Sequence, residues 1–155
     1  MHLIDLLNPR RVLIDQHSTS KKKLLELVAA RLAPESSGLD SAIYDSLCAR
    51  ERLGSTGLGH GIAIPHGRCP GLKEATGVFV RLAEPVDFGA PDGTPVDLLF
   101  ALAVPEHFTH QHLVLLSELA ALFGETHFRE QLRNAPDSKA VFALFTESQA
   151  THAAA

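Results

Sequence analysis

Residues 54–69 read Gly-Ser-Thr-Gly-Leu-Gly-His-Gly-Ile-Ala-Ile-Pro-His-Gly-Arg-Cys, and they hold five of the protein's 11 glycines. Glycine gives up side-chain packing and loses the most conformational freedom on folding, so this cluster predicts backbone that turns sharply or lies close to another group. The glycines lead into an apolar run, Ile62–Ile64, which predicts a short strand. His66 follows at the strand end, between a proline that fixes φ and a glycine that frees it. A ligand-binding or nucleophilic histidine fits this position, and so does an ordinary turn.

Length and composition limit the possible classes of protein. A chain of 155 residues with 45% hydrophobic and 21% charged residues is typical of one soluble globular domain. A net charge of −4 argues against nucleic acid as the main partner, because binding to phosphates needs a basic surface. No apolar run reaches the roughly 20 residues needed for membrane insertion. Without a visible secretory signal, Cys48 and Cys69 are expected to be free thiols in a reducing cytoplasm.

The flanking sequence predicts alternating strands and helices. Upstream of the glycine cluster we expect a strand at 11–15 and helices at 21–33 and 40–53. Downstream we expect strands at 76–82, 86–88 and 97–104, and helices at 109–123, at 128–134 and from 138 onward. The strand at 97–104 is apolar on both faces, which is typical of a central strand covered on both sides. Together these elements predict a single α/β domain over residues 1–147, in which a mixed sheet has helices on both faces. A disordered tail at 148–155 is expected to follow it.

A dinucleotide site is one interpretation of the glycines. Gly57, Gly59 and Gly61 loosely match the dinucleotide fingerprint, which needs a strand before the glycines and a helix after them. Here the order is reversed, which argues against a nucleotide site.

A zinc site is a second interpretation. His107, His110 and His112 cluster in the sequence, and His60 and His66 could join them. The chain has no His-Glu-x-x-His and no Cys-x-x-Cys motif. Stoichiometric metal after purification would be needed to support this interpretation.

A phosphoryl-accepting histidine is the third interpretation. A neutral imidazole attacks phosphorus well when its other nitrogen is held by a hydrogen bond and cations or N–H donors stabilise the phosphoryl oxygens. His66, Arg50 and His112 are the candidates. The ordinary alternatives are a solvated helix charge for Arg50 and a buried, carbonyl-bonded histidine for His112. Residue chemistry alone therefore predicts a histidine site that binds or carries phosphate.

Residues 54–67 resemble the signature of the IIA proteins of the bacterial phosphotransferase system. The resemblance is closest to the nitrogen-regulatory type and extends to the mannitol/fructose type. Residues 49–53 (Ala-Arg-Glu-Arg-Leu) and 95–102 (Pro-Val-Asp-Leu-Leu-Phe-Ala-Leu) fit the same pattern, as does the pair His112-Leu113. Together the similar segments cover residues 3–146.

The resemblance implies a phosphotransferase that carries a phosphoryl group and needs no metal or other cofactor. His66 would accept the group on Nε2 from an HPr-like phosphohistidine protein. His112 would lie beside it, Arg50 would be the active-site arginine, and Thr56 would border the site. The glycines would let the loop wrap the site and leave room for the partner's phosphohistidine.

Some positions depart from the family pattern. His60 stands where asparagine is expected, which puts an extra imidazole near the site, and Val114 stands where some relatives carry histidine. Leu58, Ile62 and Phe108 are the candidates for apolar surface that a partner would cover.

Three functions follow from the resemblance. The first is a nitrogen-regulatory carrier that controls target proteins through its phosphorylation state. The others are the IIA component of a fructose/mannitol uptake system and a non-catalytic regulatory module. The lack of an attached permease or IIB segment favours regulation, and the joint presence of His66, Arg50 and His112 argues against the non-catalytic module.

Overall fold

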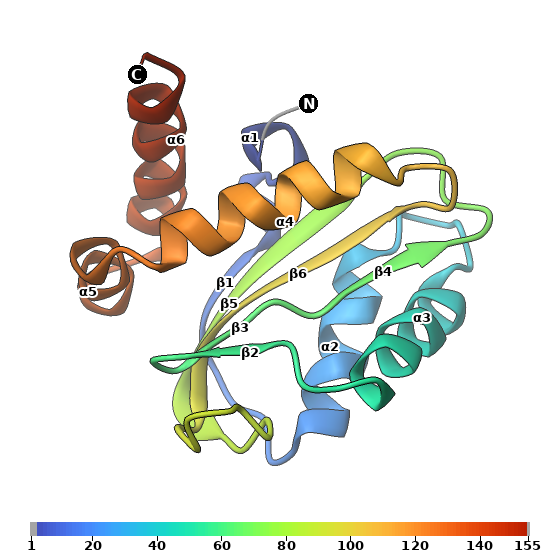
Figure 1. The fold of residues 1–155 in the computed structure, drawn as a ribbon, viewed down its shortest axis with the longest axis horizontal. Coiled ribbons are helices and arrows are strands. Elements are labelled where there is room, and N and C mark those ends of the chain that lie inside the picture. The colour runs from blue at the N-terminus through green and yellow to red at the C-terminus, as the bar shows by residue number, and fades with distance from the viewer. Residues whose placement is uncertain (1–2, 155) are drawn as a thin grey trace.

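The computed structural model describes the backbone of residues 3–154 and the side chains of residues 3–148 (Figure 1). The helices are α1 (Leu3–Leu6), α2 (Lys21–Leu32), α3 (Asp40–Arg52), α4 (His110–Phe123), α5 (Thr126–Asn134) and α6 (Ser138–Ala154), with a 3-10 turn, η1, at Pro9–Arg11. The strands are β1 (Val12–Gln16), β2 (Gly57–Gly59), β3 (Ile62–Ala63), β4 (His66–Cys69), β5 (Thr76–Val86) and β6 (Val96–Pro105).

The six strands form one mixed sheet in the order β1-β5-β6-β3-β2, and β4 also pairs with β6. The β1–β5, β3–β6 and β4–β6 pairs are parallel, whereas β5–β6 and β2–β3 are antiparallel. The predicted single α/β domain with a mixed sheet is confirmed.

Strand β6 is the centre of the core. Leu98, Phe100 and Leu102 face the layer that contains α1, α4, α5 and α6. Alternate residues such as Leu99 and Ala101 face α2 and α3 on the other side. All of these side chains are fully buried, which confirms the central strand predicted from its continuous apolar sequence. Each fully buried large apolar side chain contributes about 1.5–3 kcal/mol, so the register of β6 is strongly determined.

Two arginines, the buried Arg129 and the partly buried Arg81, satisfy the free carbonyl groups at the ends of α4 and α5. Arg129 donates to the carbonyl of Phe123 at 2.8 Å. Arg81 donates to the carbonyls of Leu132 at 2.9 Å and Ala135 at 2.8 Å. The last carbonyls of a helix have no partner inside the helix, so these bonds fasten both helix ends to the rest of the fold.

Several elements differ from the sequence prediction. Residues 66–69 form β4 rather than a connection, and residues 57–59 form β2 rather than a loop. Strand β5 continues through Pro85 to Val86, so no separate strand forms at 86–88. The pairing of β5 with β6 is irregular between Arg81 and Val86. A proline can occupy such a place because no regular ladder donor is needed there.

The end of helix α6 is later than expected, whereas the disorder expected of the tail at 148–155 stays a prediction. Helix α6 extends to Ala154, past the expected boundary at residue 147, and Ala155 lies outside the described residues. The sequence from Ser148 onward contains no glycine or proline and is rich in alanine, so nothing in it stops the helix.

Two glycines of the cluster have different physical roles. Gly61, with φ +81°, follows His60, with φ +57°, in the tight turn between β2 and β3. Two consecutive positive φ values are typical of a type I′ hairpin turn. Gly67, by contrast, has no positive φ, and a Cβ there would overlap the hydroxyl of Ser46 on α3. The expectation that Gly67 frees φ is therefore wrong, because its role is to let α3 approach β4.

Gly67→Ala is expected to destabilise the fold by about 1–3 kcal/mol, because the added methyl group pushes α3 away from β4. Urea unfolding followed by circular dichroism measures this change. In a Ser46→Ala background the same substitution should cost less, since the overlapping hydroxyl is gone. An equal loss in both backgrounds would contradict this explanation.

Candidate functional site

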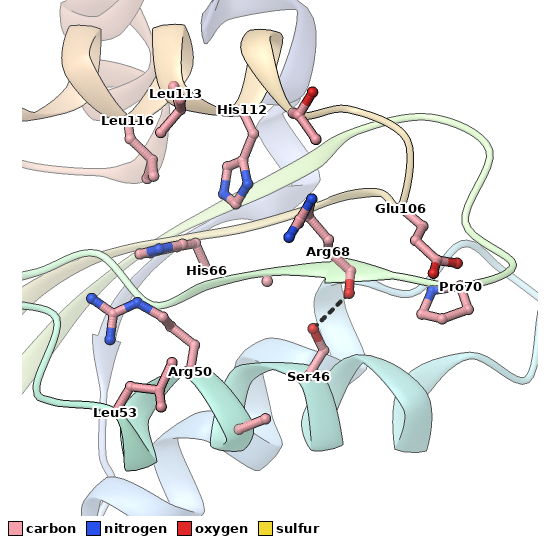
Figure 2. A pocket seen from close by; sticks show the side chains of 13 residues that line it. Ser46, Arg50, Leu53, His66, Arg68, Pro70, Glu106, His112, Leu113 and Leu116 are labelled. Atoms are coloured by element: carbon pink, nitrogen blue, oxygen red, sulfur yellow. Dashed lines mark hydrogen bonds between the residues drawn. The ribbon is translucent and has the colours of Figure 1, made fainter.

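A pocket of about 760 Å³ opens where the edge of the sheet at β4 lies between α3 and α4 (Figure 2). Three of the predicted site residues, Arg50, His66 and His112, reach it from α3, β4 and α4. The other lining residues are Ser46, Ala49, Leu53, Gly67, Arg68, Pro70, Glu106, Thr109, Leu113 and Leu116. The two helical layers of the fold therefore each supply one side of the site.

The orientation of His66 is set by one hydrogen bond. Its Nδ1 lies 2.8 Å from the carbonyl oxygen of Ile64. A carbonyl oxygen only accepts, so Nδ1 carries the proton. Burial is the largest effect on the pKa of His66 and lowers it. The Ile64 bond opposes this, and smaller effects follow from the charge of Arg50, which lowers the pKa, and of Glu51, which raises it, so that the net shift is downward. The ring is therefore neutral at physiological pH, and the lone pair of Nε2 is free.

The Ile64 carbonyl is available because the N–H across from it, that of Thr56, donates to Glu51 instead. Both β3 and β4 pair with β6, with Ile62 opposite Leu98 and His66 opposite Leu102, so the two strands keep one register. Between them, the Pro65 carbonyl accepts from the N–H of Leu102 on β6 at 2.9 Å, so the backbone of Ile64 faces the opposite edge. There the N–H of Ile64 donates to the Thr56 carbonyl at 3.1 Å, whereas the N–H of Thr56 donates to Glu51 at 3.2 Å. The Ile64 carbonyl on that edge then accepts from the imidazole.

His112 packs edge-on against His66, with ring centroids 5.2 Å apart. It is 9% exposed, and its buried Nε2 has no hydrogen-bond partner in the described structure. Burial, followed by the charges of His66 and Arg68, lowers the pKa of His112 to about 4. His112 is therefore a neutral ring with one unsatisfied polar atom beside His66. A ligand that bonded this atom would recover free energy lost on burial.

Two arginines supply positive charge. The guanidinium of Arg50 is held by a 2.8 Å bond from Nη1 to the carbonyl of Gly54. Arg68 lies two residues after His66 on β4, so both side chains leave the same face of the strand. Arg68 is not among the site residues predicted from the sequence. The spacing of two residues would have revealed it had residues 66–69 been recognised as a strand.

Thr56 does not line the pocket. It is 5% exposed, and its hydroxyl donates to the carboxylate of Glu51. The glycines at 57, 59 and 61 also lie outside the pocket lining, so the expectation that this loop wraps His66 is wrong. The loop instead forms the β2–β3 hairpin.

Exposed leucines form the rim of the pocket. Leu53 is 84% exposed and Leu113 is 67% exposed, and both line the pocket. Of the residues predicted to form an apolar surface, Leu58 is 46% exposed, whereas Ile62 is 1% exposed because it packs beside Leu98 in the core layer that contains α4. The prediction for Ile62 is therefore wrong.

His60 lies in a different pocket, of about 500 Å³, that shares no lining residue with the pocket of His66. Its N–H donates to Asp92 at 3.0 Å, and its carbonyl accepts from Arg133. An effect of this imidazole through direct contact with the site is therefore excluded. Among the described residues, no group of three or more histidines, cysteines or carboxylates is arranged to hold a metal ion. Cys48 and Cys69 are both free.

Comparison with protein families identifies the chain. The family model described as the phosphoenolpyruvate-dependent sugar phosphotransferase system, EIIA 2, matches residues 5–148. The chain belongs to this family. Within the described residues, no helix of this EIIA 2 member has both the length and the apolar character needed to cross a membrane.

Several similar proteins are named nitrogen regulatory protein. The chain is 43% identical over 150 residues to the nitrogen regulatory protein of Pseudomonas aeruginosa, which covers 96% of this chain and 97% of that protein. The crystal structure of nitrogen regulatory protein IIA-Ntr from Neisseria meningitidis matches with a TM-score of 0.88 and 45% identity over 92% of this chain and 98% of that one. The resemblance to nitrogen-regulatory IIA proteins is therefore confirmed.

The fold also matches a mannitol IIA protein. The structure of the complex of enzyme IIA-mannitol and phosphorylated enzyme IIB-mannitol from Escherichia coli gives a TM-score of 0.76 at 19% identity. It covers 91% of this chain and 97% of that one. At this identity the match shows a shared fold alone, the α/β fold expected from the sequence.

The pKa of His112 makes stability depend on pH. The pKa of this ring is about 4 in the folded protein and about 6.5 in the unfolded protein, so the unfolded state binds the proton first as pH falls. Stability is therefore lost as pH falls from about 6.5 toward 4, by about 2 kcal/mol between about pH 7.5 and 5. His112→Gln cannot titrate and should remove most of this loss in urea unfolding at both pH values. The exposed His110→Gln on the same helix is the control, and an unchanged pH dependence in His112→Gln would contradict the assignment.

Proposed function

We propose that this protein carries a phosphoryl group on Nε2 of His66, received from the phosphohistidine of an HPr-like protein, and regulates target proteins through its phosphorylation state. One observation carries the proposal. The hydrogen bond from Nδ1 to the Ile64 carbonyl leaves a neutral imidazole with its Nε2 lone pair free, in a pocket that also holds Arg50 and Arg68.

The transfer step balances without a cofactor. The Nε2 lone pair of His66 forms a bond to phosphorus while the bond from phosphorus to the donor nitrogen breaks, and that electron pair stays with the donor ring. A donor ring that carries a proton on its other nitrogen leaves as neutral imidazole. Positive charge develops on the His66 ring and is stabilised by the bond from Nδ1–H to the Ile64 carbonyl. No proton has to move during the transfer.

The charges of the pocket suit the transferred group. A charge-assisted bond from an arginine to a phosphoryl oxygen contributes about 1.5–3 kcal/mol, and both Arg50 and Arg68 line the pocket. The unpartnered Nε2 of His112 adds a polar atom beside the acceptor. When this nitrogen carries the proton, it donates to the phosphoryl group. These groups are in place before the phosphoryl group arrives, which is the arrangement that favours transfer.

The partners follow from the rim and from the similar proteins. The exposed Leu53 and Leu113 beside the site offer an apolar face to a protein donor. The mannitol IIA protein was solved with a phosphorylated IIB protein, which supports docking of a phosphoprotein on this fold. The nitrogen regulatory names of the similar proteins favour regulatory targets over sugar uptake. We place the protein in the cytoplasm with this relay, and no step requires nucleic acid or membrane insertion.

Incubation with phosphoenolpyruvate, the first enzyme of the system and an HPr-like carrier should add the mass of one phosphoryl group. The adduct is expected to be acid-labile and base-stable, as a phosphohistidine is, and absent from His66→Ala. Intact mass spectrometry with retention of the adduct at high pH measures this. Labelling of His66→Ala at the parent level would refute the assignment of the acceptor.

Arg50→Ala and Arg68→Ala are each expected to slow phosphoryl transfer by about tenfold or more, because each removes a charged contact of about 1.5–3 kcal/mol. Rapid-quench measurement of single-turnover rates provides the test. Arg52→Ala is the matched control, since Arg52 ends the same helix but does not line the pocket. If the Arg50 and Arg68 variants both match the control, the arginines do not support the phosphoryl group.

A further inference from the structure

Glu51 is a carboxylate in an unexpected place. It follows Arg50 in the last turn of α3, where the helix dipole disfavours negative charge, yet its side chain is only 5% exposed. It does not line the pocket of His66 but a separate hollow of about 410 Å³ between α2 and α3. A buried charge is tolerated only when it is well paired, so the partners of Glu51 explain why it is there.

Both carboxylate oxygens of Glu51 are occupied. Oε1 lies 2.8 Å from Nζ of Lys21 at the start of α2 and accepts from the N–H of Thr56 at 3.2 Å. Oε2 accepts from the hydroxyl of Thr56. Lys21 is itself held, because its Nζ donates to the Phe88 carbonyl at 3.3 Å and lies 4.5 Å from the centre of the Phe88 ring. The carboxylate therefore ties Thr56 to a fixed cation on a second helix.

Thr56 connects this ion pair to the acceptor. The Thr56 carbonyl accepts from the N–H of Ile64 at 3.1 Å, and the Ile64 carbonyl accepts from Nδ1 of His66 at 2.8 Å. Each group in this series holds the next in position, and Thr56 is bonded on both sides.

The same loop also holds the arginine. Gly54, two residues before Thr56, accepts from Nη1 of Arg50 at 2.8 Å. The anchored loop at 54–56 therefore positions both the carbonyl that orients Arg50 and the strand that orients His66. Glu51 also acts on the site electrostatically, because its negative charge raises the pKa of His66 and so opposes the lowering by burial.

We infer that Glu51, anchored by Lys21, is a positioning residue that holds His66 in the Nδ1–H tautomer and Arg50 in its place through Thr56 and the loop at 54–56. This inference rests on the proposed function of His66 as the acceptor. Glu51 touches none of the reacting atoms, so its effect is on geometry and tautomer rather than on the chemistry of the phosphoryl group.

The test uses the full chain with ¹⁵N-labelled histidine. In the parent, the ¹⁵N shifts of the His66 ring should show a single Nδ1–H tautomer. In Glu51→Ala we expect a mixture of the two tautomers, together with transfer from the HPr-like donor slowed by about tenfold. The half-saturating donor concentration should change less than about twofold, because the rim that meets the donor is intact. Asp45→Asn, an exposed carboxylate on the same helix, should match the parent in all three measurements.

Further variants at Thr56 and Lys21 keep the test decisive if Glu51→Ala fails to fold. Thr56→Val removes the hydroxyl bond to Glu51 but keeps the N–H bond, and Thr56→Ser restores the hydroxyl. Thr56→Val is expected to shift the tautomer in the same direction as Glu51→Ala, and Thr56→Ser should recover the parent tautomer. The His66 tautomer in Lys21→Met is compared with that in the control Lys23→Met, since Lys23 is exposed in the same helical turn.

A folded Glu51→Ala, or Thr56→Val in its absence, with the parent tautomer and the parent rate would overturn the inference. Failure of the proposed function would look different, because His66→Ala would then be labelled like the parent. The tautomer measurement needs no phosphoryl donor, so it decides the positioning role in either case.

Discussion

The site depends on one register, that of β3 and β4 on β6. These two short strands pair with β6 as a single strand would, with Ile62 opposite Leu98 and His66 opposite Leu102. A slip of one residue in β6 would move its fully buried side chains to the wrong helical layer, so the hydrophobic core fixes the register. The core thereby determines where His66 lies, and the Ile64 carbonyl on the edge away from β6 orients it.

Burial and charge act together at the pocket. Burial keeps His66 and His112 neutral, and Arg50 and Arg68 supply cations at the same opening. In the protein alone, the buried Nε2 of His112 is unsatisfied, and Arg68 donates no side-chain bond among those seen in the described residues. Polar groups held in this state gain more from an anion than groups already bonded would, because little reorganisation is needed. The free energy lost on burying the two histidines is offset by the apolar packing of β6.

The sequence predicts the elements whose patterns are long and strong. Helices α2 and α3 follow from their apolar spacing, and β6 from its continuous apolar run. Residue chemistry already makes His66, Arg50 and His112 candidates, but only family resemblance assigns their roles, because ordinary explanations remain open for each. Strand β4 was missed because a histidine, a glycine and an arginine have little strand propensity, and only pairing with β6 makes them a strand. The roles of Gly67 and Arg68 and the burial of Ile62 could not be predicted, because they depend on contacts with segments that are distant in the sequence.

The exposed rim has a consequence for how the proposed carrier binds. Leu53 and Leu113 are 84% and 67% exposed, and single exposed leucines are ordinary in a free protein. Burying both against a partner would contribute about 3–6 kcal/mol, which is no more than association itself costs in lost freedom. Charge at Arg50 and Arg68 can speed encounter, but it is screened by salt and adds little lasting affinity. Such a face binds a partner briefly, and brief binding is what lets one carrier meet a donor and then a target.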